Sequence, residues 1–92
     1  MSTYQPLSCD LYDYLEIACM HGYHLRVELI DGTNLQAQAL TTRTNAQKEE
    51  FFCLQGDDGP LEIRLDQLLA ITPSDPQASF GRIELAGHFC SL

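Results

Sequence analysis

The stretch Cys9–Ala39, CDLYDYLEIACMHGYHLRVELIDGTNLQAQA, changes its hydrophobic period from that of a helix to that of a strand. At 100° per residue, apolar side chains of its first part fall on one side of a helix and acidic side chains fall on the other. The inner set is Leu11, Tyr14, Leu15 and Ala18, and the outer set is Asp13, Glu16 and Met20. We therefore expect an amphipathic helix over residues 9–21, ended by Gly22, with one side on a core and the other presenting carboxylates.

Beyond the helix the period is two, which is typical of half-buried strands. Strands are expected over residues 23–30 and 35–39, joined at Asp31-Gly32, a dipeptide that favours a hairpin turn. The polar residues Thr41–Lys48 are expected to form a loop. Further strands are expected over residues 49–55, 61–65, 69–72 and 80–86, with a single helical turn at 66–68 and with Phe51–Leu54 as the most buried run.

One helix followed by five or six short antiparallel strands predicts a mainly β protein with a small Sm-like or SH3-like antiparallel barrel. An OB-fold is the nearest alternative, but its helix normally falls between strands. The chain has 92 residues, which is enough for one domain with one core. Within a single domain over residues 1–92, we expect a flexible segment at 1–8, the helix at 9–21, the barrel at 23–86 and a tail at 87–92.

The charge balance is strongly acidic, with five Lys and Arg against thirteen Asp and Glu and a net charge of −8. Nucleic-acid binding depends on neutralising phosphates with positive charge. The electrostatic field of this acidic protein therefore has the wrong sign for binding RNA or DNA. A partner with a basic surface would instead be attracted. The alternative, that the charge only keeps a small protein soluble, stays open at this point.

Two further features bear on location. No apolar run is long enough to span a bilayer. The first twenty residues contain no Lys or Arg and are interrupted by acidic residues, which argues against a secretory signal. We expect a cytoplasmic protein.

The residues that could carry chemistry do not form a convincing site. The four cysteines, at positions 9, 19, 53 and 90, include no CxxC pair, and reduced, mostly buried thiols are expected. Cys19, His21 and His24 straddle a helix end, so they share no face that could bind a metal. Cys53 or Cys90 could pair with His88, but apolar surroundings are predicted to keep both thiols inert.

The acidic dipeptide Asp57-Asp58 could bind calcium or magnesium only with further ligands, which the sequence does not supply nearby. No phosphate-binding glycine loop is present either. From these residues we expect no enzyme activity, no metal and no cofactor.

Tyr12 borders the acidic side of the expected helix. Tyrosine is enriched at the anchor positions of protein interfaces, and carboxylates can pair with the Arg and Lys side chains that bind phosphates. An exposed ring at Tyr12 could fill a base-stacking site of an RNA-binding surface. A helix side that is merely solvated remains the alternative.

Three motifs carry a family resemblance. They are TYQPLSCDLYDYLEIAC at residues 3–19, the pattern LxxELxDGxxLQAxA at residues 25–39, and LEIRLD at residues 61–66. In these motifs the chain resembles the Rof (YaeO) family of Rho-specific inhibitors of transcription termination. The loop at 41–48 and the residues after Pro73 depart from the family pattern.

The resemblance implies an Sm-like fold and binding to Rho, a hexameric RNA helicase. It further implies that the protein covers the primary RNA-binding OB surface on the N-terminal domain of Rho, so that transcript cannot load. By position, the residues implied to bind Rho are Tyr12, Asp13 and Glu16, supported by Tyr4 and Asp10, with Asn45 and Lys48 as candidates in the loop.

Two other functions stay open. The first is an Sm-like RNA-binding module, which needs a basic rim that only Arg43 and Lys48 could begin. The second is an SH3-like adaptor for another basic protein. The resemblance favours a non-enzymatic Rho inhibitor that is monomeric by itself and binds neither nucleic acid nor membranes.

Overall fold

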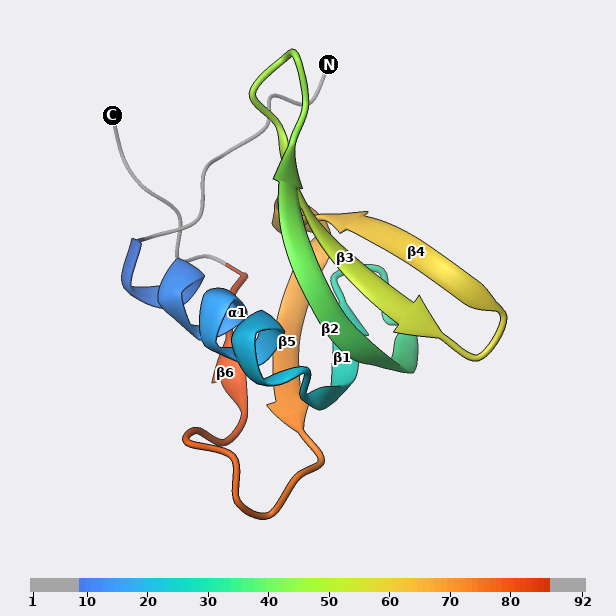
Figure 1. The fold of residues 1–92 in the computed structure, drawn as a ribbon. Helices are drawn as coiled ribbons and strands as arrows, with labels where there is room; N and C mark the ends of the chain where they lie inside the picture. Colours follow the sequence, from blue (N-terminus) through green and yellow to red (C-terminus); the bar gives the residue numbers. More distant parts are fainter. Residues whose placement is uncertain (1–8, 87–92) are drawn as a thin grey trace.

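The computed structural model of this chain describes residues 9–86 and shows a strongly bent antiparallel sheet with one helix against it (Figure 1). In chain order the elements are α1 Cys9–His21, β1 His24–Leu29, β2 Asn34–Thr44, β3 Glu50–Gly56, β4 Gly59–Arg64, the 3-10 helix η1 Leu65–Gln67, β5 Leu68–Pro73 and β6 Ile83–Glu84. The strand order in the sheet is β4-β3-β2-β1-β5-β6. The predicted class, mainly β with one N-terminal helix, is confirmed.

The two sides of α1 are those that the sequence predicts. Leu15 and Ala18 are fully buried, whereas Asp13, Glu16 and Met20 are exposed. Leu11 and Tyr14, the other predicted inner residues, are half-buried.

The end of α1 is fixed by backbone hydrogen bonds around Gly22. The Gly22 N–H donates to the Cys19 carbonyl at 3.2 Å, and the Tyr23 N–H donates to the Ala18 carbonyl at 3.0 Å. Gly22 has a φ of 62°, a left-handed conformation that glycine adopts without steric cost. This exit turns the chain directly into β1.

β2 is longer than predicted and is the strand around which the sheet bends. Its first half pairs with β1 and its second half pairs with β3, and the register shifts between Ala39 and Thr41. The predicted loop Thr41–Lys48 is therefore wrong in its first half, because Thr41–Thr44 continue the strand opposite Cys53–Glu50. β-Branched threonines fit a pleated surface, so this polar segment can form a strand. The connection that remains is residues 45–49.

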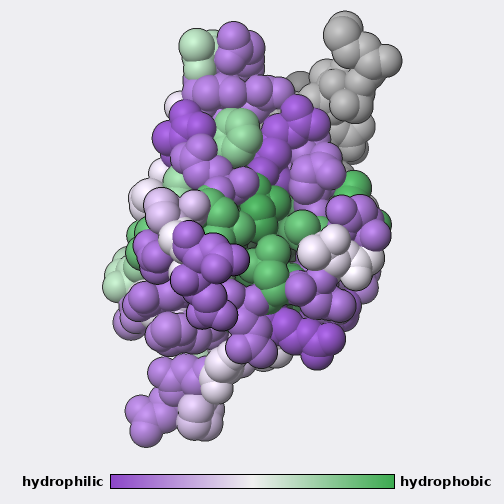
Figure 2. Space-filling view, turned by 90° about the vertical axis from the view of Figure 1, so that its right-hand side faces the viewer, coloured by the Kyte–Doolittle hydropathy of each residue, from purple (hydrophilic) through white to green (hydrophobic). Residues whose placement is uncertain are grey.

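The sheet is barrel-like but does not close. Within residues 9–86, β4 and β6 are its two edges. Figure 2, which faces the side carrying β3 and β4, shows apolar residues gathered inside a polar rim. Between the start of β2 and the β3–β4 hairpin lies a hollow of about 410 Å³, lined by Leu35, Gln36 and the run Gly56–Leu61.

The core lies between α1 and the concave side of the sheet. Its largest fully buried side chains come from α1, β1, β3, η1 and β5 and from the residue after β6; they are Phe52, Leu15, Leu25, Leu54, Leu65, Leu68, Ile71, Leu85 and Val27. The run Phe51–Leu54 is only alternately buried: Phe52 and Leu54 face the core, whereas Phe51 and Cys53 are half-buried on the other side.

The last predicted strand, 80–86, is wrong except at Ile83–Glu84. The Phe80 ring instead stands edge-on to the rings of Tyr14 and Tyr23, with centroids 5.0 and 5.9 Å apart. The Tyr23 hydroxyl accepts a hydrogen bond from the Ser79 N–H at 3.2 Å. Because Phe80 packs over the helix–sheet junction, the backbone around it does not pair with β5. No helix in the described part of the chain is long and apolar enough to cross a membrane.

Candidate functional site

One side of α1 carries a group of exposed side chains that we call the acidic helix face. It consists of Asp10, Asp13, Glu16 and Met20. Met20 is 77% exposed, although it is apolar. The sequence places Met20 on this side of the helix but offers no reason to give it a role.

The carboxylates of the acidic helix face have no cationic partner among residues 10–86. Most basic side chains of the protein are instead paired elsewhere: Arg43 with Glu62, Arg64 with Glu49 and Asp66, and Arg82 with Glu28 and Glu84. The negative charge of α1 is therefore not neutralised within the described fold. It is available to cations of another molecule.

Tyr12 lies beside this face but is not the freely exposed ring that the sequence suggested. It is half-buried against the core, and its hydroxyl donates a hydrogen bond to the Thr42 Oγ1 at 2.9 Å. This contact joins the first half of α1 to the second half of β2. Thr42 is three residues from Asn45, so the 45–49 loop begins about 10 Å along the chain from this contact.

Of the two predicted contact residues in the loop, Asn45 has its side chain occupied within the loop. Its Oδ1 accepts hydrogen bonds from the N–H groups of Gln47 and Glu49 at 3.0 and 2.9 Å, and its Nδ2 donates to the Glu49 Oε1 at 2.8 Å. Lys48 is exposed. Tyr4 lies outside the described residues.

Arg43 cannot act as the free cation that an RNA-binding rim would require. Its guanidinium makes two hydrogen bonds to the Glu62 carboxylate, at 2.7 and 2.8 Å, and lies 5.0 Å from the centre of the Phe51 ring. Hydrogen bonds from Arg43 and Cys53 lower the pKa of Glu62, so the carboxylate stays ionised. Of the two residues that could begin a basic rim, only Lys48 keeps its charge uncompensated in the described fold.

The residues considered for metal or nucleophilic chemistry are held apart or used in packing. The His21 ring stacks on Tyr23 with centroids 5.3 Å apart, and residues 9–86 contain no group of three His, Cys, Asp or Glu placed to hold a metal ion. The predicted apolar surroundings of Cys53 are wrong, because its thiol donates to the Glu62 Oε2 at 3.3 Å. Burial and this carboxylate both raise the pKa of Cys53. His88 and Cys90 lie outside the described residues.

Cys19 should be a slow nucleophile. Burial, with smaller contributions from the nearby Cys53 and Glu16, raises the pKa of its thiol from 9.0 to about 11. Two pKa units lower the thiolate fraction near pH 8 by about a hundredfold. In a Cys9→Ser/Cys53→Ser/Cys90→Ser variant, alkylation by iodoacetamide at pH 8 should therefore be far slower in the native protein than in guanidinium. The rate should keep rising up to about pH 11. Equal rates in both states would contradict the shift.

Comparisons with known proteins agree on one family. The family described as "Modulator of Rho-dependent transcription termination (ROF)" matches residues 6–85. The proteins named Protein rof from Escherichia coli (strain K12) and from Shigella flexneri are each 42% identical over 72 residues, covering 76% of this chain and 82% of theirs.

A solved structure, "YaeO bound to Magnesium from Vibrio cholerae O395", superposes with a TM-score of 0.72 at 29% identity, covering 79% of this chain and 95% of that one. The matched region contains α1 and every strand of the described sheet. The chain therefore belongs to the Rof family of modulators of Rho-dependent transcription termination.

Proposed function

We propose that this protein inhibits Rho-dependent termination by binding the N-terminal OB domain of Rho through its acidic helix face and blocking the primary RNA-binding site there. The observation that carries the proposal is the pair of exposed carboxylates of Asp13 and Glu16, which have no basic partner within residues 10–86. An RNA site is lined by the cations that hold phosphates. Carboxylates fixed on one helix side can occupy the same cations.

The side chains around the two carboxylates suit a protein interface. Tyr12 places an aromatic edge beside them, held in orientation by its bond to Thr42. Met20 adds an exposed, flexible apolar side chain on the same side of α1. Asp10 extends the negative charge toward the helix start, and Tyr4 is proposed as a further contact. Occlusion of this kind requires no catalytic step and takes place in the cytoplasm, where Rho acts.

Isothermal titration against the isolated N-terminal domain of Rho tests the proposal. Binding should be measurable without RNA. The apparent affinity should fall as the concentration of a competing single-stranded RNA oligomer is raised to saturation. Added salt should also weaken it, because exposed charges are screened over about 8–10 Å at physiological ionic strength. Unchanged affinity at saturating RNA would show that the two ligands do not compete.

The same materials separate the two alternative functions. Tight binding of this protein to single-stranded RNA in a gel shift would favour the Sm-like RNA-binding module. Failure to bind Rho at all would favour an adaptor for another basic protein. The net charge of −8 and the pairing of Arg43 with Glu62 argue against the first of these.

A further inference from the structure

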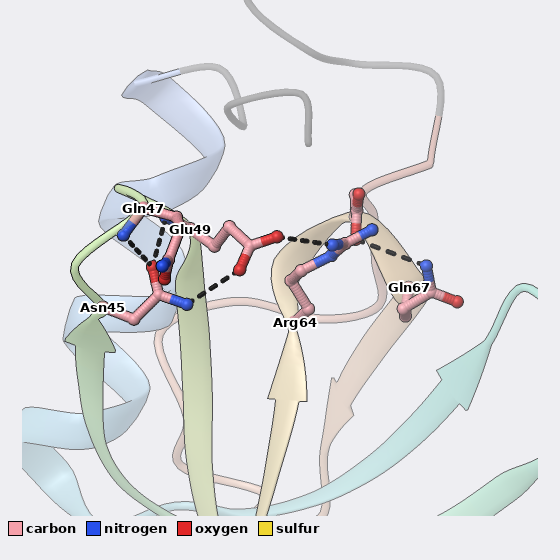
Figure 3. A network of polar contacts seen from close by, with 6 residues as sticks. Asn45, Gln47, Glu49, Arg64 and Gln67 are labelled. Atoms are coloured by element: carbon pink, nitrogen blue, oxygen red, sulfur yellow. Dashed lines mark hydrogen bonds and ion pairs between the residues drawn. The ribbon is translucent and has the colours of Figure 1, made fainter. Parts of the chain in front are cut away.

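A continuous chain of polar contacts holds the 45–49 loop against the turn after β4 (Figure 3). Asn45 donates to one carboxylate oxygen of Glu49, and Arg64 Nη1 lies 2.8 Å from the other. Arg64 Nε is 2.7 Å from Asp66 Oδ1, to which Gln67 also donates. We call these five side chains, Asn45, Glu49, Arg64, Asp66 and Gln67, the loop network.

The loop network is better shielded from water than the other ion pairs of the sheet. The side chains of Arg64, Glu49 and Asp66 are 22%, 28% and 13% exposed. The side chains of the Arg43–Glu62 pair, which joins β2 to β4, are far more exposed. Partly buried ion pairs are screened less by salt and hold their geometry better than exposed pairs.

The loop backbone is in a conformation that needs such support. Lys48 has a φ of 64°, and it is the only non-glycine residue with a positive φ among those described. A left-handed conformation is unfavourable for a residue with a Cβ and persists only where its surroundings fix it. Here the Lys48 N–H donates to the Asn45 carbonyl and the Asn45 N–H donates to the Glu49 carbonyl, both at 3.0 Å.

The result is an exposed ammonium on a loop whose backbone is held by hydrogen bonds. Within residues 10–86, no carboxylate forms an ion pair with Lys48. The hydrogen bond from Tyr12 to Thr42 joins α1 to β2 three residues before this loop begins. The loop that carries this exposed cation therefore continues from the part of β2 that is joined to α1.

We propose that Glu49, Arg64 and Asp66 are positioning residues that preorganise the loop so that Lys48 contacts a carboxylate on Rho, beside the site covered by the acidic helix face. This inference rests on the proposed function. It changes the role expected of Asn45, whose amide is used inside the loop network rather than at the interface. It also defines the partner surface: basic groups with an acidic group next to them, a pattern that an RNA chain, uniformly negative, does not offer.

A double-mutant cycle on Rho binding tests the inference. Glu49→Gln keeps the shape of the side chain and removes its charge from Arg64, and Lys48→Met removes the proposed contact. Each single variant should bind the N-terminal domain of Rho about three- to tenfold more weakly, the range for loosening a preorganised contact. The double variant should bind no more weakly than Lys48→Met alone. Once the Lys48 contact is removed, loosening the loop has no further effect on the affinity.

A measurement on the free protein separates positioning from a direct contact. In Glu49→Gln, the amides of residues 47–49 should exchange with deuterium faster than in the wild type, while those of β1 and β5 should not change. Glu62→Gln is the matched control, since it removes the same charge from the exposed Arg43–Glu62 pair, which joins β2 to β4. It should alter neither loop exchange nor Rho affinity by more than about twofold, as expected for an exposed pair.

Three results would overturn the inference. They are full multiplication of the two single effects in the double variant, unchanged loop exchange in Glu49→Gln, and unchanged Rho affinity in Lys48→Met. If these occur while reversal of Asp13 and Glu16 still prevents Rho binding, the helix-mediated function stands and only the role of the loop is wrong. If that reversal leaves binding intact, the proposed function itself fails.

Discussion

Replacing Asp13 and Glu16 together by lysine is expected to lower the affinity for the N-terminal domain of Rho by at least about a hundredfold. Losing one partner of a desolvated charge pair costs roughly 2–5 kcal/mol, and reversal adds repulsion from the cations that should have been paired. Both side chains are exposed and lie on the side of α1 away from the core, so the fold should survive. Isothermal titration gives the affinity, and circular dichroism checks the fold.

The matched control is Asp57→Lys with Asp58→Lys. These exposed residues form the turn between β3 and β4, and their reversal changes the net charge by the same amount. If the binding depended only on overall charge, the two double variants would lose affinity equally. A selective loss in the helix variant would locate the interface, whereas unchanged affinity in that variant would eliminate the acidic helix face as the Rho contact.

Phe52→Ala is expected to produce the largest loss of stability, about 3–5 kcal/mol of the free energy of unfolding. Phe52 is the largest fully buried side chain, and it lies on β3 in the core beneath α1. For a domain of this size each kcal/mol shifts the melting temperature by about 4–8 °C, so a decrease on the order of 15–30 °C is expected. Thermal unfolding followed by circular dichroism measures it.

Phe51→Ala provides the comparison, because the same residue type is removed from the same strand on its opposite side. Phe51 is half-buried, and the Arg43 guanidinium lies over its ring. Its removal should cost on the order of 1 kcal/mol, the typical effect of a substitution outside the core. Similar costs for the two variants would contradict the position of the core described above.

The features that the sequence predicted well depend on local patterns. The 3.6-residue period around Leu15 and Ala18 defines the buried side of α1, and Gly22 marks its end with the backbone freedom that the exit requires. The motifs at residues 3–19 and 25–39 also indicate the family. None of these inferences depends on contacts between residues that are far apart in the chain.

The features that the sequence missed depend on residues far apart in the chain. Thr41–Thr44 look like a loop by composition, but pairing with Cys53–Glu50 makes them a strand. Phe80 looks like part of a strand, but its ring packs against the rings of Tyr14 and Tyr23 instead. In both cases tertiary contacts outweigh local propensity.

For this protein, the sequence by itself determined the helix, the succession along the chain of one helix and then strands, the family, and the exposure of Asp13, Glu16 and Met20 on the outer side of the helix. Only the tertiary structure decided which charges are compensated: the guanidinium groups of Arg43, Arg64 and Arg82 lie within ion-pair distance of carboxylates from other elements, whereas Asp13 and Glu16 meet no cation within residues 10–86. The reason is geometric: an ion pair requires a separation of a few ångströms, and Arg82 and Glu28 are 54 residues apart in the chain. A count of charges cannot show that distance.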